Sequence, residues 1–260
     1  MKTKSALAYV IFAAIFAEAA FLNAAEPSAG QTAQRFEKQI VVKLDYLLSV
    51  PADYNKGADK KWPLMLFLHG SGECGSDVNK VKKHGPPHVI DENPDCELAR
   101  RFIVVSPQNP AHLMWKADEL MALLDEIQGR YRVDEDRVYL TGLSLGGFGT
   151  WLLAETYPKR FAAIAPVCGG GCSDLAFRLK KTPVWIFHGE QDKTVPIALS
   201  ESMAAALKKA GADVKFTRYP DLGHDCWTKT YANPELYEWF LSHKRGQDAK
   251  PTETEKTDKK

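Results

Sequence analysis

The sequence predicts an α/β fold with a doubly wound, mostly parallel sheet and no large cap domain. Short apolar runs bounded by Gly, Pro or Asn recur along the chain, as expected for strands buried on both faces of a parallel sheet. Segments with apolar residues at helical spacing lie between these runs, and such alternation is typical of a doubly wound sheet. A tight turn, Gly142-Leu143-Ser144-Leu145-Gly146, joins one of these strands to the helix that follows it.

The predicted strands and helices follow one another in a regular order. A mixture of apolar and polar residues at 39–47 predicts an edge hairpin strand. Continuous apolar runs predict buried strands at 63–69, 102–106, 138–141, 162–167, 184–188 and 214–219. Helices are predicted around 120–127 and at 148–157, 196–209 and 234–243. No long insertion interrupts this order, so we expect no separate cap.

The composition is that of an ordinary globular protein. The chain has 260 residues, of which 45% are hydrophobic and 26% charged, enough for one sizeable core. Its net charge of +1 gives no electrostatic reason to bind nucleic acid or an anionic membrane.

We expect one folded domain over residues 36–244. Residues 246–260 have no large apolar side chain, so we expect a disordered, charged tail there.

Residues 1–25 have the pattern of an export signal. Lys2 and Lys4 form a basic start, residues 6–17 are an uninterrupted apolar run, and small residues lead to Ala25. The run is shorter than the roughly 20 apolar residues that span a bilayer. We therefore expect an exported protein, periplasmic or extracellular, that contacts a membrane only if this segment is retained. A buried or interfacial helix is the alternative.

Three polar residues follow predicted strands and form a candidate catalytic group. Ser144 lies in the G-x-S-x-G turn, Asp192 follows the run at 184–188, and His224 follows the run at 214–219. The carboxyl ends of parallel strands share one edge of a sheet, so the three side chains are expected to meet there. A serine becomes a nucleophile when a base takes its proton and an acid orients that base. The order predicts Ser144 as nucleophile, Asp192 as acid and His224 as base.

Other residues compete for two of these roles. Glu190 is the closer rival acid, and Asp221 lies only three residues from His224, an awkward separation for an orienting group. Taken alone, Asp192 is equally well explained as a turn or helix-cap residue, and His224 as a surface loop residue. The other histidines of interest are expected to be structural: His69, His112 and His188.

A negatively charged intermediate on the substrate carbonyl needs preorganised N–H donors. The residue after the nucleophile, Leu145, is expected to supply one of them. The second is expected from the loop after the strand at 63–69, with Ser71 as first choice and Gly72 as second.

Three further residues are candidates for contacting a substrate. Trp115 lies in a loop after the strand at 102–106, Trp227 lies three residues past His224, and Glu73 lies in the loop of the second donor. Both indoles are suited to lining an acyl or sugar pocket, and both have ordinary packing as the alternative. With no cap, we expect these loops to form an open cleft.

The stretch Gly70-Ser71-Gly72-Glu73-Cys74-Gly75 also matches the G-x-G-x-x-G pattern of dinucleotide sites, with Asp91 at the distance of a ribose contact. However, residues 78–87 are polar and broken by Gly85-Pro86-Pro87, which makes a poor packing helix. Dinucleotide binding is therefore the weaker interpretation. No P-loop and no metal-ligand spacing of His and Cys is present, so neither a cofactor nor a metal is expected.

The five cysteines are an odd number, which leaves at least one unpaired thiol in an exported protein. Cys172 and Cys226 lie in loops expected at the same sheet edge, so we expect a disulfide between them. Cys74 with Cys96 is a weaker second pair. Cys168 ends an apolar run and is expected to be a buried free thiol.

Several segments together resemble a known group of proteins. These segments are Leu68-His69-Gly70-Ser71-Gly72-Glu73, Tyr131-Arg132-Val133-Asp134, the stretch from Arg137 to Gly147, and Gly223-His224-Asp225. They resemble the secreted bacterial esterase/"predicted peptidase" group of α/β-hydrolases, which is similar to polyhydroxybutyrate depolymerases and to feruloyl and acetylxylan esterases. The resemblance covers residues 64–243 and implies the α/β-hydrolase fold with Ser144, Asp192 and His224 as nucleophile, acid and base.

The resemblance implies a secreted serine esterase, with acyl esters on plant polysaccharide as the preferred substrates. Members of the group carry Arg near the position of Cys74 and Ser near that of Cys226, and this departure strengthens the expectation of a disulfide. A serine peptidase of the same fold is one alternative. A non-catalytic carbohydrate-binding protein on the same scaffold is another, although such a protein would ordinarily lack one of the three residues.

Overall fold

A computed structural model of the chain describes residues 31, 33–111 and 113–246. The predicted export signal and the tail beyond residue 246 lie outside the described residues. Contacts divide the chain into two units, Met1–Ile40 and Val41–Lys260. The described part of the first unit contains no helix or strand. All elements below belong to the second unit.

A seven-stranded sheet forms the centre of this unit, in the order β1-β3-β2-β4-β5-β6-β7. β1 runs antiparallel to β3, and every other pair is parallel. The strands are β1 (Tyr46–Ser49), β2 (Trp62–Leu68), β3 (Ile103–Pro107), β4 (Val133–Leu143), β5 (Ala163–Val167), β6 (Val184–Gly189) and β7 (Val214–Tyr219). The doubly wound, mostly parallel sheet predicted from the apolar runs is confirmed.

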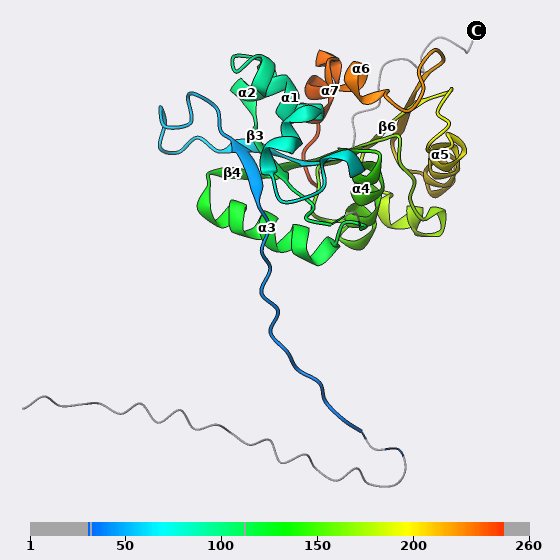
Figure 1. Cartoon of the computed structure of the whole chain (residues 1–260), viewed down its shortest axis with the longest axis horizontal. Coiled ribbons are helices and arrows are strands. Elements are labelled where there is room, and N and C mark those ends of the chain that lie inside the picture. Colours follow the sequence, from blue (N-terminus) through cyan, green and yellow to red (C-terminus); the bar gives the residue numbers. More distant parts are fainter. Residues whose placement is uncertain (1–30, 32, 112, 247–260) are drawn as a thin grey trace, which may run out of the picture. The chain divides into compact units, whose positions relative to one another are not determined.

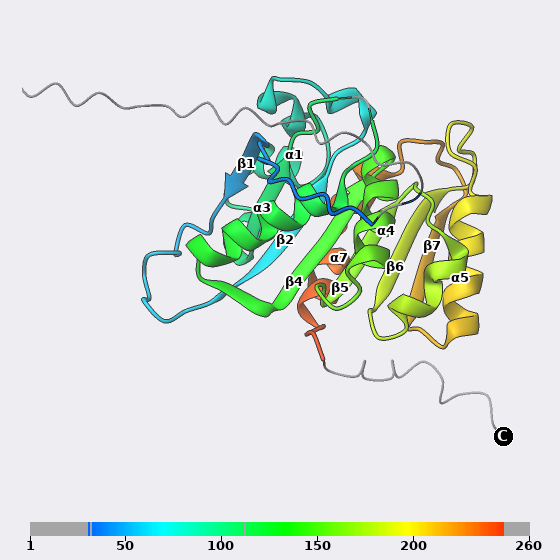
Figure 2. The ribbon, with the colours of Figure 1, turned by 90° about the horizontal axis from the view of Figure 1, so that it is seen from below.

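Helices cover both faces of the sheet (Figures 1 and 2). Residues of α3, α4 and α5 pack in one core cluster, and residues of α1, α2, α6 and α7 pack in the other. The α-helices are α1 (Gly85–Glu92), α2 (Glu97–Arg101), α3 (Ala117–Arg130), α4 (Leu145–Thr156), α5 (Ala198–Ala210), α6 (Trp227–Tyr231) and α7 (Pro234–Leu241). Three 3₁₀-helices complete the described elements: Ser71–Glu73, Val78–Lys83 and Ser173–Leu179.

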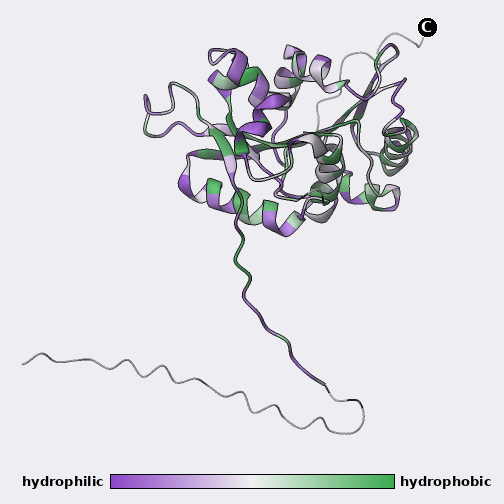
Figure 3. Cartoon of the chain, in the orientation of Figure 1, coloured by the Kyte–Doolittle hydropathy of each residue, from purple (hydrophilic) through white to green (hydrophobic). Residues whose placement is uncertain are grey.

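The strand sequences explain this layering. Every residue of β2, β3, β5 and β6 is buried, because helices shield both faces and the side chains on each face need apolar neighbours. α3 instead has one buried stripe, made by Leu120, Leu123, Leu124 and Ile127, and its two sides differ in hydropathy (Figure 3). The connection between β5 and β6 contains only a short 3₁₀-helix, which leaves no room for a cap domain there.

Two elements differ from the sequence-based expectation. The edge strand is shorter and later than residues 39–47, because β1 begins at Tyr46 and pairs with β3 rather than forming a hairpin. Residues 78–87, which the sequence predicts to make a poor packing helix, form the 3₁₀-helix Val78–Lys83 and the first turn of α1. Pro86 and Pro87 lie in its first turn, where a missing N–H removes no helical hydrogen bond and the fixed φ of proline suits the helix.

Candidate active site

Ser144 lies at a strained turn between β4 and α4. Its backbone has φ 53° and ψ −117°, a conformation with positive φ that non-glycine residues adopt at a cost of about 1–3 kcal/mol. The turn is tight because α4 begins immediately after the strand. A Cβ on Gly142 would lie 2.4 Å from the carbonyl oxygen of Gly146. Glycine is therefore required at position 142, two residues before the serine. The half-buried Ser144 side chain lies at the carboxyl edge of the sheet.

Ser144, His224 and Asp192 are brought together in a hydrogen-bonded series. His224 Nε2 lies 2.9 Å from Ser144 Oγ, and His224 Nδ1 lies 2.7 Å from Asp192 Oδ2. The three residues follow β4, β7 and β6, so the parallel strands gather them as the sequence predicted. Because Asp192 accepts from Nδ1–H, the other ring nitrogen is left as an acceptor for the serine hydroxyl proton.

Asp192 is held as an ionised carboxylate. Its side chain is fully buried, and burial alone would raise its pKa. Hydrogen bonds from His224 and from the N–H groups of Val195 and Thr194 outweigh that effect and lower the pKa of Asp192. Those two N–H groups lie 2.9 Å and 2.8 Å from Oδ1. The carboxylate is thus charged and fixed in orientation.

The rival acids lie outside this series. Glu190 is exposed and faces Arg218, with 4.0 Å between the carboxylate and the guanidinium. Asp221 is also exposed. Neither side chain has a hydrogen bond to His224 in the described structure, whereas Asp192 has one.

Two backbone segments next to the serine offer N–H groups. Leu145 is the first residue of α4, and the first N–H groups of a helix have no partner within it. Ser71 and Gly72 begin the 3₁₀-helix Ser71–Glu73 that follows β2. Gly70, just before them, lies close to Ser144, because a Cβ placed on it would be 3.6 Å from Ser144 Cβ. The predicted donor segments therefore flank Ser144.

Of the predicted substrate-contacting residues, Trp227 lies directly beside His224. Their ring centroids are 5.2 Å apart, with the rings nearly perpendicular. Trp227 also packs against His84, at 5.4 Å between ring centroids. Its indole Nε1 is shielded from solvent and has no hydrogen-bond partner. His84, which sequence patterns did not single out, is thus joined to the site through Trp227.

Glu73 is buried close to the serine. Its side chain is 3% exposed, and its Oε1 lies 3.9 Å from His84 Nε2. Burial raises the pKa of Glu73. A Cβ on Gly70 would lie 3.3 Å from Glu73 Oε2 and 3.6 Å from Ser144 Cβ, so the carboxyl group lies in the buried wall beside Ser144 rather than on an exposed rim.

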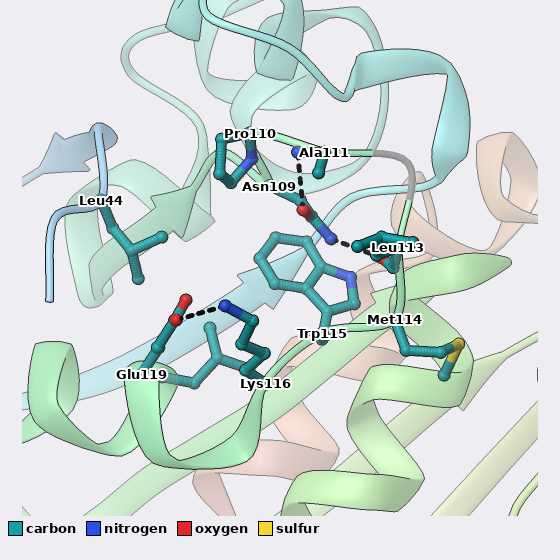
Figure 4. A pocket seen from close by; sticks show the side chains of 10 residues that line it. Leu44, Asn109, Pro110, Ala111, Leu113, Met114, Trp115, Lys116 and Glu119 are labelled. Atoms are coloured by element: carbon teal, nitrogen blue, oxygen red, sulfur yellow. Dashed lines mark hydrogen bonds and ion pairs between the residues drawn. The ribbon is translucent and has the colours of Figure 1, made fainter. Parts of the chain in front are cut away.

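Trp115 belongs to the core, which corrects the expectation that it rims an open cleft. It is 4% exposed and packs edge-on against His69, at 5.0 Å between ring centroids. Its ring also lies over Gly149 of α4, where a Cβ would approach it to 2.6 Å. The indole borders a small pocket of about 70 Å³ near Asn109 and Lys116 (Figure 4). With both faces covered, it has no room to stack on a sugar.

The remaining histidines have distinct environments. His69 is fully buried, with Nδ1 bonded to the Gly70 carbonyl and Nε2 accepting from the Asn109 N–H. These two bonds tie the His69 ring to the loops that contain Ser71 and Asn109. This agrees with the structural role expected for His69. His188 is also fully buried, and its Nε2 lies 3.2 Å from Asp192 Oδ2. His112 lies outside the described residues.

The expected disulfide between Cys172 and Cys226 does not form. Cys172 is exposed and Cys226 is fully buried, and both are free thiols, as are Cys74, Cys96 and Cys168. The sequence places both residues in neighbouring loops, but the Cys172 side chain faces solvent and the Cys226 side chain faces the core. The neighbour of Cys226 is instead Cys168, and this proximity adds to burial in raising the pKa of the Cys168 thiol.

The described residues contain one group of side-chain atoms close enough together to hold a metal ion: Cys168, Asp192 and His224, within 4.8 Å of one another. Asp192 and His224 are hydrogen-bonded to each other, and burial raises the pKa of the Cys168 thiol well above its usual range. Because His224 is hydrogen-bonded to both Asp192 and Ser144, we assign Asp192 and His224 to the serine site.

The dinucleotide interpretation fails on local structure. A dinucleotide fingerprint needs a helix that opens at its glycines. The stretch from Gly70 to Gly75 forms only a 3₁₀ turn, and the next α-helix begins at Gly85. Asp91 is paired with Lys82 on the protein surface.

Comparison with known proteins decides the family. The dienelactone hydrolase family profile matches residues 102–239, more than half of the chain. The chain belongs to the dienelactone hydrolase family. Its fold is therefore the α/β-hydrolase fold, and the predictions of that fold and of a serine hydrolase are confirmed.

Individual relatives agree with this membership. A solved thermostable esterase superimposes with a TM-score of 0.69 at 33% identity, covering 78% of this chain and 60% of that protein. A probable carboxylesterase SOBER1-like protein of Arabidopsis thaliana is 26% identical over 62% of this chain and 71% of its own length. A bifunctional acetylxylan esterase/xylanase of Neocallimastix patriciarum is 24% identical over 68% of this chain but only 26% of its own length.

No helix within the described residues is long and apolar enough to cross a membrane. The apolar run at 6–17 lies outside that part of the chain.

Proposed function

We propose that this hydrolase is an exported serine esterase that cleaves carboxylic esters through Ser144, His224 and Asp192. The observation that carries the proposal is the hydrogen-bonded series from Ser144 Oγ through the His224 ring to Asp192 Oδ2, with contacts of 2.9 Å and 2.7 Å. A nucleophile, a base and an orienting acid in this order are what acyl transfer requires. Relatives named as carboxylesterases and esterases support the same class.

The geometry implies a two-step reaction. Ser144 Oγ attacks the ester carbonyl while His224 Nε2 takes the hydroxyl proton, and Asp192 stabilises the imidazolium that forms. His224 then returns the proton to the departing alkoxide, which leaves an acyl group on Ser144. A water molecule, activated by the same histidine, releases the acid and restores the serine.

The N–H groups of Leu145 and Ser71 would stabilise the negative charge on the carbonyl oxygen. Both belong to segments beside Ser144, one at the start of α4 and one at the start of the 3₁₀-helix after β2. Gly72 is the second choice for the latter donor, and the space at its Cα is open, since no atom lies within 4 Å of a Cβ placed there. Each such donor contributes about 3 kcal/mol to transition-state stabilisation in other hydrolases.

The surroundings of His224 favour a bulky, polar leaving group. The departing alkoxide must lie within reach of His224 Nε2 to receive its proton, and Trp227 packs against the same ring. Beyond Trp227, a groove of about 380 Å³ runs between α1 and α6. Its wall is mostly apolar, with His84, His88, Glu92 and Asn93 among the polar residues that line it. An indole with polar neighbours suits a sugar ring, so we propose acyl esters of plant polysaccharide, acetyl or feruloyl, as the preferred substrates.

Hydrolysis of a substrate panel tests this function. Turnover is measured on p-nitrophenyl esters from acetate to decanoate, acetylated xylan, methyl ferulate and peptide amides. We expect ester cleavage that falls as the acyl chain lengthens, with acetylated xylan or methyl ferulate among the better substrates. Preference for peptide amides would indicate a serine peptidase, and binding of xylan with no turnover would indicate a carbohydrate-binding protein. Preference for decanoate would indicate a lipid-directed esterase.

The role of Trp227 is tested with a matched aromatic control. Trp239, on α7, is also half-buried, but it packs against Trp185 rather than against His224. Trp227→Ala should lower kcat/KM on acetylated xylan by roughly tenfold more than on p-nitrophenyl acetate, because only the polymer uses the groove. Trp239→Ala should affect both substrates equally. Equal losses in the Trp227 variant would remove the sugar-binding role.

Export is proposed from the sequence alone. The basic start, the apolar run at 6–17 and the small residues up to Ala25 carry it. Expression of the whole chain, followed by N-terminal sequencing of the periplasmic or secreted protein, should give a start near residue 26. Recovery of an uncleaved chain from the cytoplasm would contradict export.

A further inference from the structure

A second histidine contacts the carboxylate that orients His224. His188 is near the end of β6 and is fully buried. Its Nε2 lies 3.2 Å from Asp192 Oδ2, the same oxygen that lies 2.7 Å from His224 Nδ1. Oδ2 therefore faces two imidazole rings, one in β6 and one in the loop after the neighbouring strand β7. The three-residue series described above accounts for only one of them.

The environment of His188 determines where its proton lies. Nε2 also lies 2.9 Å from the Val195 carbonyl oxygen, so both of its neighbours are acceptors and Nε2 must carry a hydrogen. Burial lowers the pKa of His188, which keeps the ring neutral near neutral pH. Nδ1 is then an acceptor for the Ser200 hydroxyl at 2.7 Å, which shares its single proton between Nδ1 and the Gly169 carbonyl oxygen.

The ring is fixed by elements on three sides. Ser200 belongs to α5, and its Oγ also lies 3.1 Å from the Gly169 carbonyl oxygen in the loop after β5. Val195 lies in the segment that also donates two N–H groups to Asp192 Oδ1. His188 thus connects the Asp192 turn to α5 and to the loop after β5, with no freedom to rotate away.

We propose that His188 is a positioning residue of the esterase, whose Nε2–H fixes Asp192 Oδ2 and limits the negative charge that Oδ2 presents to His224. This inference rests on the proposed function of Ser144, His224 and Asp192 in ester hydrolysis. His188 touches neither the serine nor the carbonyl that Ser144 would attack, so it acts through Asp192 alone.

The two contacts affect how strongly Asp192 holds His224. With His188 present, Oδ2 shares its charge between two N–H groups. Without that second donor, Oδ2 attracts the positively charged His224 ring that forms during the reaction more strongly. The titratable groups facing this region are Asp192, His224 and the Cys168 thiol from the loop after β5. Arg218, opposite His188 on β7, is exposed and paired with Glu201.

Three variants test the proposal. His188→Phe keeps a ring but removes the N–H, His188→Gln keeps a donor of similar reach, and Ser200→Ala removes a partner on the other side of the ring. For each, kcat/KM on p-nitrophenyl acetate is measured from pH 4 to pH 9, normalised to the amount of serine that reacts with a fluorophosphonate, so that misfolded protein does not count. The melting temperature is recorded in parallel.

We expect His188→Phe to lower kcat/KM by roughly 10- to 100-fold and to move the acid limb of the profile to higher pH by about half a unit. His188→Gln should restore most of the limb position. Ser200→Ala removes the hydroxyl that holds Nδ1, so it should move the limb in the same direction as His188→Phe but by less. A limb that stays or moves to lower pH in His188→Phe, or a larger shift in Ser200→Ala than in His188→Phe, would overturn the proposal. If Ser144→Ala were fully active, the proposed function itself would fail instead.

Discussion

Gly146 lies directly against the carbonyl oxygen of Leu68, so closely that a Cβ on Gly146 would come within 1.9 Å of that oxygen. This contact joins the first turn of α4 to the end of β2. It brings the serine turn next to the loop that carries Ser71, and it holds the two segments that offer N–H groups to a bound carbonyl. The second glycine of the G-x-S-x-G turn is thus required by packing against a neighbouring strand.

Gly146→Ala should therefore displace the start of α4 and with it Ser144. We expect kcat/KM on a p-nitrophenyl ester to fall by roughly 100-fold or more, since displacements of about 1 Å at a reacting group have that effect. Gly129→Ala is the matched control, because Gly129 lies in α3 and no atom lies within 4 Å of a Cβ placed there. Near-normal activity of the Gly146 variant would show that the contact does not position the serine.

The choice between the two neighbouring acids gives a second prediction. Asp192→Asn removes the charge that fixes the His224 ring, and we expect kcat to fall by roughly 10³-fold or more. Glu190→Gln removes an exposed carboxylate that faces Arg218, so kcat should stay within about twofold. Steady-state kinetics of both variants decide the matter. A larger loss in the Glu190 variant would make Glu190 the orienting acid.

Glu155 gives a prediction about stability and pH. It is buried in α4, accepts a hydrogen bond from the Cys172 N–H at 2.9 Å, and burial raises its pKa from 4.5 to about 7. The folded protein therefore holds this proton more tightly than the unfolded chain does. The associated stability is complete below about pH 4.5 and is lost as the pH rises through about 7.

Glu155→Gln keeps an acceptor for Cys172 but removes the titration. Urea unfolding at pH 5 and pH 8 should show that the variant gains stability relative to the parent as the pH rises, by up to about 3 kcal/mol. Glu126→Gln, at an exposed site on α3 paired with Arg130, serves as the control and should show no such gain. A pH-independent difference between Glu155→Gln and the parent would mean that Glu155 is ionised in the fold throughout this range.

The sequence predicts the sheet and the three site residues because each rests on a local pattern with one structural solution. An apolar run of five or six residues between helices has to be a buried strand. A serine between two glycines at the end of such a run has to turn sharply, as Ser144 does. Asp192 and His224 follow two further strands, and a parallel sheet brings those ends together without any information on side-chain direction.

Features that depend on side-chain direction could not be predicted in the same way. Cys172 and Cys226 lie in neighbouring loops, but one faces solvent and the other the core, so no disulfide forms. Trp115 was expected at the cleft, but Gly149 leaves a space on α4 that its ring fills. His188 stands within a buried strand end, where the sequence gives no sign that its Nε2 faces Asp192.

Covalent labelling of Ser144 tests the proposed chemistry most directly. The whole chain and its Ser144→Ala variant are treated with a fluorophosphonate, which reacts with a serine only when a base activates it, and both are measured by intact mass and peptide mapping. We expect one adduct per chain on the peptide that contains Ser144, loss of esterase activity in step with labelling, and no adduct on the variant. Labelling at a different residue, or a Ser144→Ala variant with activity within a few-fold of the parent, would contradict the assignment of Ser144 as the nucleophile.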